Sequence, residues 1–359
     1  LHIYNNKNLY NPNLNYQTLR VQLYSDYEAM DTDPIIASTL DILSDEATLK
    51  NDMGEVLSVK SSDENIQKVL YNLFYDVLNI EFNLWSWTRN MCKYGDFFLK
   101  LEIAEEFGVY NVLPYTVYHM TRQEGLDPEN PARVTFQLDP DGLASSQDPN
   151  YRPKSNKKVI EFDNYEIAHF RLISDTNYLP YGRSFIEPAR KIFKQLTLME
   201  DAMLIHRIMR APEKRTFYIN VGQIPPNEVE QFMQKTINQM KKTPFVDPNT
   251  GDYNLRFNMM NMMEDYYIPM RGGDTQTKID TTKGLDYDGT NDIEYLRDKM
   301  FAALKVPKAY FGYEGDLQGK ATLAAEDIRF ARTVERIQRI MESELTKIAL
   351  VHLYTQGFK

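Results

Sequence analysis

The chain has 359 residues, of which 42% are hydrophobic and 26% charged. This length supplies apolar material for a real core and for two or three lobes. No stretch reaches the roughly 20 consecutive apolar residues that a membrane-spanning helix requires, and the first residues lack the basic-then-apolar order of a secretory signal.

The chain is acidic, with 51 Asp and Glu residues against 41 Lys and Arg, a formal net charge of -10. Proteins that grip nucleic acid by neutralising its phosphates normally carry a basic surplus, so the composition argues against that class. It remains compatible with a protein along which DNA slides, because strong phosphate contacts would trap the DNA. The single cysteine, Cys92, excludes an internal disulfide and is interpreted as a core residue.

Helices are expected in the first part of the chain, followed by strands. Residues 1–31 are rich in Asn and Tyr and predict an extended arm. Asp33 and Pro34 open a helix, and apolar spacing predicts further helices at about 62–80 and 81–94. Period-two patterns then predict strands within 97–103, 109–113, 115–118, 133–138, 158–162 and 167–172. Residues 121–158 are broken by Pro, Gly and Asp, and predict surface hairpin and loop.

A long helix dominates the second part. Ser184 is a favourable N-cap and Glu187 completes a capping box, so the helix is expected to run to about Ala211, about 40 Å at the standard rise. A small lobe of strands and one helix opening at Asn227 follows. Further elements are expected at 291–305 (helix), 308–320 (glycine-punctuated loop) and 322–351 (amphipathic helix). The fold class is therefore α+β.

The residues predict no catalytic site. The five histidines show no metal-ligand spacing, and Asp286-Tyr-Asp-Gly lacks the other ligands of a calcium loop. The segment from Gly315 to Thr322 looks like a phosphate-binding loop. However, it has three residues between its glycines where four are needed, and Ala321 follows the Lys. We therefore expect no enzyme, no metal and no cofactor.

Several runs of residues carry a family resemblance. These are YGRSFIEPARKIFKQL at 181–196, MEDAMLIHRIMRAPEKRTFYI at 199–219, EDYY at 264–267, DIEYLR at 292–297, AALKVP at 302–307 and EDIRFAR at 326–332. In this order they resemble the portal proteins of T-even-type, contractile-tailed bacteriophages. The resemblance spans most of the chain and is strongest from about 165 to 340.

This resemblance implies a dodecameric ring whose subunits have a wing, a stem, a clip and a crown. The wing would comprise 1–183 and 321–359, the stem 184–213 and 291–306, the clip 214–290 and the channel loop 307–320. The family normally has more sequence after the last helix, so the crown is expected to be missing or reduced.

The same resemblance makes the glycine-rich segment a channel loop that narrows the bore around DNA. Its residues are Gly312, Tyr313, Glu314, Gly315, Asp316, Leu317, Gln318, Gly319 and Lys320. An ordinary surface loop is the alternative interpretation.

Three further clusters have two interpretations each. Arg329, Arg332, Arg336 and Arg339 lie on one helix face, either contacting DNA or a neighbouring subunit, or paired with Glu326, Glu335, Glu342 and Glu344. Arg207, Arg210, Lys214 and Arg215 lie where the stem would enter the clip, and complement a helix dipole. Met259, Met260, Met262 and Met263 suit either a surface that meets several partners or core packing.

The functional expectation is a portal vertex subunit through which DNA enters and leaves a capsid. Its implied partners are other copies of itself, double-stranded DNA in transit, the large terminase that acts as the packaging motor, the major capsid protein and scaffold, and neck or head-completion proteins. The implied location is a unique vertex of the virion, after assembly in the host cytoplasm. A ring-forming head–tail adaptor and a metal-dependent nucleic-acid enzyme are the alternatives.

Overall fold

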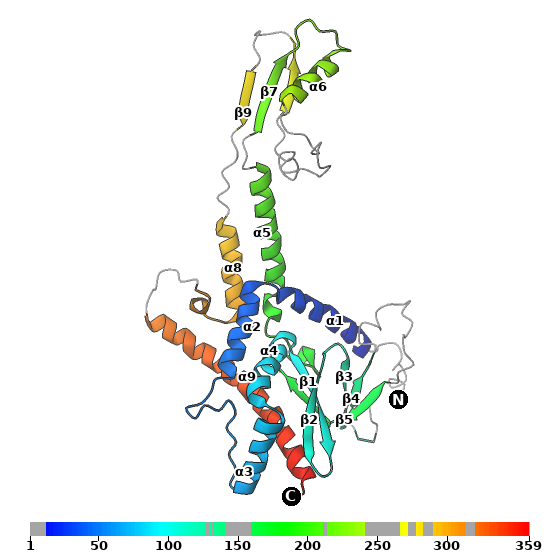
Figure 1. Ribbon diagram of the computed structural model, residues 1–359, viewed down its shortest axis with the longest axis vertical. Helices are drawn as coiled ribbons and strands as arrows, with labels where there is room; N and C mark the ends of the chain where they lie inside the picture. The colour runs from blue at the N-terminus through cyan, green and yellow to red at the C-terminus, as the bar shows by residue number, and fades with distance from the viewer. Residues whose placement is uncertain are drawn as a thin grey trace, which may run out of the picture. The chain divides into compact units, whose positions relative to one another are not determined.

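The computed structural model describes residues 12–125, 129–130, 132–140, 159–210, 214–240, 266–271, 278–282, 290–312 and 320–358. The chain divides into two units. Unit 1 comprises Leu1–Phe193 and Asp298–Lys359, and unit 2 comprises Lys194–Arg297. Figure 1 labels most of the helices and strands of both units.

Helices make up much of unit 1. They are α1 (Pro12–Met30), α2 (Pro34–Ala47), α3 (Glu64–Tyr71) with a π-helical turn at Asn72–Val77, α4 (Ile80–Tyr94) and α9 (Lys320–Thr355). The Asp33 carboxylate caps α2 by accepting hydrogen bonds from the backbone N–H of Ile35 (2.9 Å) and Ile36 (3.1 Å), which confirms the expected helix start.

The extended arm expected for residues 1–31 is wrong from Pro12 onward, because this stretch forms α1. Its inner face buries Arg20, Leu23, Tyr24, Tyr27 and Met30, which recur at helical spacing. Tyrosine and arginine fill part of that face, so the apolar pattern alone did not reveal it. Residues 1–11 lie outside the described part.

Two antiparallel sheets form the β part of unit 1. One has the order β2-β1-β6 and the other β3-β4-β5. The strands are β1 (Asp96–Ala104), β2 (Gly108–Tyr115), β3 (Met120–Glu124), β4 (Val134–Leu138), β5 (Ile160–Asp163) and β6 (Ile167–Arg171). The strand expected at 115–118 is wrong, since β2 ends at Tyr115. β3 was not expected, because its residues are mostly polar.

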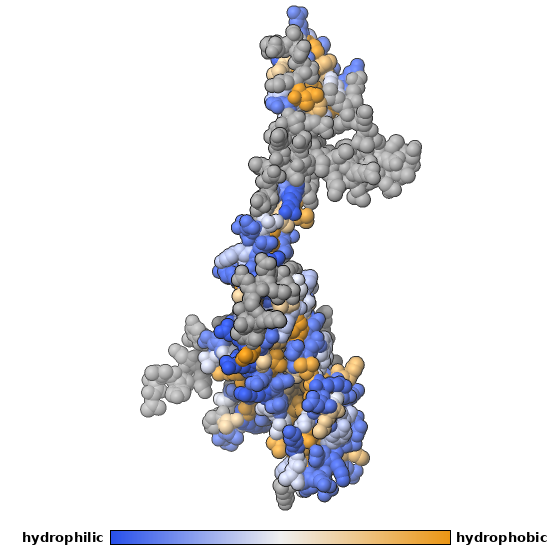
Figure 2. Space-filling model, turned by 90° about the vertical axis from the view of Figure 1, so that its left-hand side faces the viewer, coloured by the Kyte–Doolittle hydropathy of each residue, from blue (hydrophilic) through white to orange (hydrophobic). Residues whose placement is uncertain are grey.

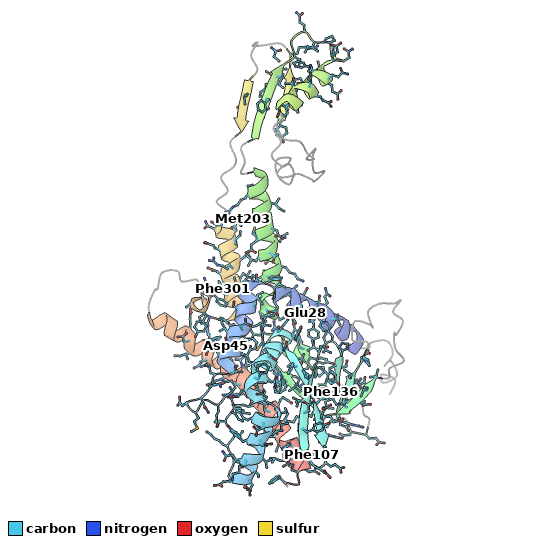
Figure 3. The ribbon with its side chains drawn as sticks, in the orientation of Figure 1. Glu28, Asp45, Phe107, Phe136, Met203 and Phe301 are labelled. Carbon is cyan, nitrogen blue, oxygen red and sulfur yellow. The ribbon has the colours of Figure 1, made fainter. Side chains whose placement is uncertain are left out.

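The core of unit 1 lies between these sheets and the helices. α9 packs against β6, β2 and α2, and α4 packs against α2 and β1. Phe136 of β4 is fully buried and meets the rings of Phe98 and His169, whereas Phe107, between β1 and β2, is 67% exposed. Figure 3 labels Phe136 and Phe107. Figure 2 shows mostly polar side chains on the visible surface of unit 1, with apolar ones between them.

Two glycines hold the junction between α4, β1 and the turn that precedes α5. Gly95 ends α4 with φ +85°, and its carbonyl accepts a hydrogen bond from Leu172 N–H at 2.8 Å. A Cβ atom on Gly182 would lie 1.9 Å from the Gly95 oxygen, and one on Gly95 would lie 2.6 Å from the backbone of Arg183. Only glycine fits at either position.

The expected capping box before α5 is wrong. The Ser184 hydroxyl donates to the carbonyl of Lys93 (2.6 Å) and accepts from Ile186 N–H (3.2 Å). The Glu187 carboxylate instead accepts a hydrogen bond from Tyr27 (2.7 Å) and pairs with Arg190 (3.1 Å). A 3-10 turn at Glu187–Ala189 precedes α5 (Arg190–Arg210), which has 21 residues where about 28 were expected.

Unit 2 contains a small three-stranded sheet of order β8-β7-β9. Its elements are β7 (Lys214–Asn220), α6 (Val229–Met240), β8 (Tyr266–Met270) and β9 (Lys278–Thr282); α8 (Thr290–Leu304) follows. β7 pairs with β8 in parallel and with β9 antiparallel. Ile219, Val221 and Met233 form a buried cluster between this sheet and α6.

Replacing Gly95 by Ala should destabilise the protein by several kcal/mol, because both strain and overlap with Arg183 oppose the new methyl group. Gly54→Ala is the matched control, since Gly54 has φ +82° and nothing within 4 Å of an added Cβ. Its cost should stay near 1–2 kcal/mol. Chemical denaturation measures both values, and equal losses would contradict the close packing.

Candidate functional site

The four arginines on α9 are all exposed. Arg339 pairs with Glu335 at 3.8 Å, a separation and exposure typical of a weak surface pair. Within the described residues, Arg329, Arg332 and Arg336 form no ion pair. The row therefore carries net positive charge, and its role as a surface for DNA or a neighbouring subunit stays a prediction.

The other predicted clusters are only partly described. Arg207 is exposed on α5. Arg210 is the last residue of α5, and Lys214 and Arg215 are the first residues of β7. The side chains of these three residues lie outside the described part. Met259, Met260, Met262 and Met263 also lie outside it.

The predicted channel loop is framed by two described positions. Gly312 caps a 3-10 turn at Lys308–Phe311 with φ +72°, a conformation that favours glycine, and Lys320 begins α9. The residues between them, Tyr313, Glu314, Gly315, Asp316, Leu317, Gln318 and Gly319, lie outside the described residues.

A buried charged cluster in unit 1 was not expected from the sequence. The Asp96 carboxylate accepts hydrogen bonds through Oδ1 from Gly182 N–H (2.8 Å) and from the His169 ring (2.8 Å). Arg122 lies 3.3 Å from Nδ1 of His169 and can only donate, so Nδ1 accepts and Nε2–H donates to Asp96. Burial, assisted by nearby arginines, lowers the pKa of His169, which therefore stays neutral.

Arg20 supplies the positive charge of this cluster. Its guanidinium lies 3.5 Å from the ring centroid of Tyr181 and donates to Tyr24 at 3.0 Å. Burial raises the pKa of Asp96 to about 7, and the charge of Arg20 opposes that rise. The cluster joins α1, β1, β6 and the turn at Gly182, which is a structural function. A polar residue opening an otherwise apolar strand, as Asp96 does, is the sequence signal that could have revealed it.

A second buried histidine fastens the end of α9. Nδ1 of His352 accepts a hydrogen bond from Val109 N–H at 3.1 Å, and the ring packs directly against Gly108. Accepting this bond requires the neutral ring. Burial lowers the pKa of His352 accordingly.

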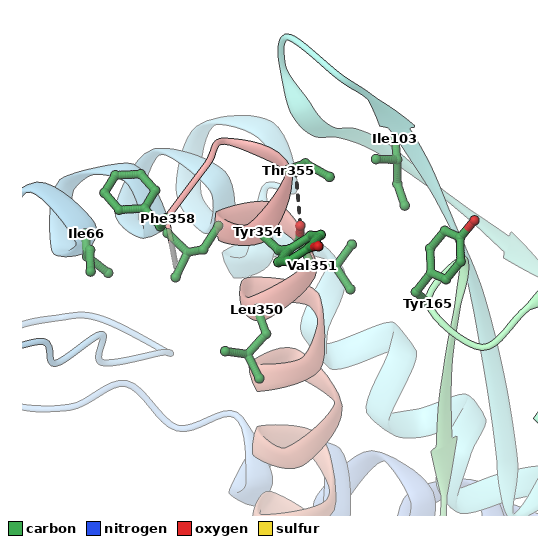
Figure 4. A pocket seen from close by; sticks show the side chains of 9 residues that line it. Ile66, Ile103, Tyr165, Leu350, Val351, Tyr354, Thr355 and Phe358 are labelled. Carbon is green, nitrogen blue, oxygen red and sulfur yellow. Dashed lines mark hydrogen bonds between the residues drawn. The ribbon is translucent and has the colours of Figure 1, made fainter. Parts of the chain in front are cut away.

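One cavity of unit 1 is mostly apolar. Its volume is about 870 Å³, and it is lined almost entirely by apolar side chains from the end of α9 and its neighbours, including Ile66, Ile103, Leu350 and Phe358 (Figure 4). The Thr355 hydroxyl at its edge donates to the carbonyl of Val351. Among the described residues no three His, Cys, Asp or Glu side chains gather as metal ligands.

The described helices include none that is both long and apolar enough to cross a bilayer.

In the sheet of unit 2, the residue at which the chain enters lies beside the residue at which the chain leaves. Lys214, the first residue of β7, is paired with Thr282, the last of β9, and the antiparallel ladder continues to Tyr218 and Lys278. The chain thus enters and leaves this sheet at one point. A lobe inserted between two helices requires such an arrangement.

A family model decides the assignment. The model of the bacteriophage T4-like portal protein (Gp20) matches residues 20–358. The chain belongs to this portal protein family. The family is structural rather than enzymatic.

Curated relatives of this portal protein include two from phages. The portal protein of Vibrio phage KVP40 is 29% identical over 208 residues, which cover 55% of this chain and 41% of the relative. The portal protein of Salmonella phage ViI is 30% identical over 199 residues, covering 53% and 34%. The matched segment thus covers less than half of each relative.

Solved structures share the fold. A chain in the virion of a native gene transfer agent particle has a TM-score of 0.52 at 14% identity, covering 92% of this chain and 81% of that chain. A chain in the neck of an empty gene transfer agent particle has a TM-score of 0.55 at 15% identity, covering 94% and 82%. One chain of each particle therefore shares the mixed helix-and-sheet fold of this chain.

Substituting Met for Arg20 should lower the free energy of unfolding by about 1–3 kcal/mol, because the variant loses the hydrogen bond to Tyr24 and the nearby positive charge that favours ionisation of the buried Asp96. Arg329→Met, an exposed arginine of α9, should change it by no more than about 0.5 kcal/mol. Urea denaturation at neutral pH compares the two. A small loss for the Arg20 variant would show that Asp96 is not held by Arg20.

Acidification should weaken the attachment of α9 through His352. The folded-state pKa lies below the ordinary value of about 6.5, so the unfolded chain gains a proton there that the folded chain does not. This stability is present above pH 6.5 and is lost as the pH falls below it. His352→Gln should therefore lose less stability between pH 7.5 and 5 than the wild type, measured by denaturation at each pH. Equal losses would contradict the assignment.

Proposed function

We propose that this chain is a portal vertex subunit, twelve copies of which form a ring around a channel for DNA. The ring admits DNA into a phage capsid during packaging and releases it during ejection. It also docks the large terminase and, later, neck proteins. The family match over residues 20–358 is the observation that carries this proposal.

The regions follow from the order of the elements. The wing comprises 1–183 and 321–359, the stem 184–213 and 291–306, and the clip 214–290. α5 and α8 occupy the two stem segments, and the small sheet lies between them in the sequence. The pairing of Lys214 with Thr282 supports this assignment, because it brings the last strand of the sheet back beside the first residue of β7.

The acidic composition suits a channel along which DNA moves. Twelve copies at -10 each give an assembly charge of about -120, and an electronegative bore repels the DNA backbone instead of binding it. The loop from Gly312 to Lys320 narrows that bore. The four arginines of α9 supply local positive charge at the surface of each subunit.

The partners are assigned by the same proposal. The energy for packaging comes from a separate ATPase, the large terminase, which meets the clip near Met259, Met260, Met262 and Met263 and the basic cluster at Arg207, Arg210, Lys214 and Arg215. The wing lies in the capsid vertex beside the major capsid protein and scaffold. Assembly takes place in the host cytoplasm.

Electron microscopy of the purified chain tests the ring directly. We expect closed rings with a central opening wide enough for duplex DNA, about 20 Å. A ring lacking such a tunnel would favour a head–tail adaptor. DNA cleavage that requires magnesium would favour a nucleic-acid enzyme, and a chain that stays monomeric would overturn the proposal.

Deleting residues 312–319 tests the channel loop. The deletion should leave ring assembly intact and reduce the packaging or retention of DNA, because it falls between the 3-10 turn that ends at Phe311 and α9, which begins at Lys320, and removes no residue of a described helix or strand. Packaging assays with mutant and wild-type proheads measure the effect. Unchanged packaging would exclude the channel-loop role.

A further inference from the structure

A small cavity in unit 1 combines three positive charges. Its volume is about 220 Å³. It lies where the end of β6, the turn before α5, the end of α8 and the middle of α9 converge. The residues that carry the argument are Arg183, Lys305, Arg336, Ser174, Thr333 and Phe185. We call it the cationic cavity.

No carboxylate lines the cationic cavity. Asp175 approaches Arg183 from outside the lining at 3.7 Å, which is long for a charge-assisted hydrogen bond. Within the described residues, no acid pairs with Lys305 or Arg336. The helical neighbours of Arg336 at i−4 and i+3 are Arg332 and Arg339, so its own helix adds like charge.

Arg183 has an unused donor. Its Nε is buried without a hydrogen-bond partner, although the guanidinium lies over the ring of Tyr178. A buried donor without an acceptor destabilises a protein, so such atoms call for a specific explanation. An acceptor supplied from outside the chain provides one.

The backbone on two sides of the cavity is held in position, at Lys305 and at Arg183. Lys305 ends α8 with φ +56°, a left-handed conformation in which glycine is normally preferred. A left-handed residue directly after the last helical residue ends the helix at a defined point, so it fixes the backbone position of Lys305. The opposite wall is held by the hydrogen bond from Arg183 N–H to the Leu172 carbonyl (3.0 Å) and by the Ser184 hydroxyl.

We propose that the cationic cavity binds a carboxylate side chain of a second copy of this chain. The inference depends on the proposed ring. The cavity has room for one Asp or Glu side chain, whose oxygens would meet Lys305 and Arg336, with the hydroxyl of Ser174 as a further donor. Acidic residues outnumber basic ones by ten in each copy, so a neighbouring copy offers the complementary charge. A closed ring also requires two different faces on each subunit, one accepting and one inserting.

Charge reversal tests the cavity in the full-length chain. Lys305→Glu combined with Arg336→Glu should raise the concentration for half-assembly at least tenfold, measured by mass photometry, because two attractions become repulsions. Lys60→Glu combined with Lys68→Glu is the matched control. It reverses two charges at exposed positions before and within α3, outside the cavity and outside the arginine row, and should assemble like the wild type. Circular dichroism and melting temperature establish that each variant is folded.

Zero-length carbodiimide cross-linking identifies the occupant. In rings assembled from mixed ¹⁵N-labelled and unlabelled chains, Lys305 should become linked to an Asp or Glu of the other isotope. Lys305→Arg keeps the charge but removes the reactive amine, so it should assemble normally without this cross-link. A link from Lys305 only to its own chain, for example to Asp175, would overturn the inference.

The remaining outcomes are distinct. If the cavity double variant assembles like the wild type, or if the control double variant weakens assembly equally, the cavity is not the binding site and the portal function stands. If assembly is unchanged but anisotropy with a labelled 30-base-pair duplex shows lost binding, the cavity takes a nucleic-acid phosphate and the inference is wrong. A wild-type chain that forms no ring removes the portal proposal and this inference together.

Discussion

Unit 1 depends on the close approach of two backbone segments at Gly95 and Gly182. The carbonyl of Gly95 accepts a hydrogen bond from Leu172 N–H, directly after β6. The side chain of Asp96 accepts one from Gly182 N–H, in the turn that precedes α5. The contact is too tight for any side chain and buries a carboxylate, so the neighbouring elements must supply its compensation. Arg20 from α1 and His169 from β6 do so. The start of α5 is thereby fixed to the sheet.

The parts of the fold that the sequence predicted are those in which local pattern and burial agree. Asp33 before Pro34 has one favourable role, that of an N-cap, and α9 buries apolar residues at helical spacing from Phe330 to Ile348. The misassigned parts have polar atoms in buried positions. Tyr24 and Tyr27 line the inner face of α1, and Glu187 serves Tyr27 and Arg190, so neither α1 nor the start of α5 followed from spacing alone. In these cases the structure was determined by contacts between residues far apart in the sequence, as between Tyr27 and Glu187.

The candidate surfaces divide in the same way. The arginine row of α9 could be predicted because four residues on one helix share a face whatever the tertiary structure. The cationic cavity could not, because Arg183, Lys305 and Arg336 come from three separate elements and meet only in the folded chain. The buried Asp96 cluster was equally hidden, since His169 occupies an ordinary inward position of β6. Residue type showed the available chemistry, and topology decided which groups meet.

The pairing of Lys214 with Thr282 has an evolutionary consequence. Because β7 and β9 are adjacent and antiparallel, the segment between them begins and ends at neighbouring points, as in domains that tolerate insertion into a host protein. Its own small core of Ile219, Val221 and Met233 makes few demands on the rest of the chain. Such a module can lengthen, shrink or be exchanged between lineages while the host body keeps its packing. Divergence in this segment can therefore run faster than in the body that carries it.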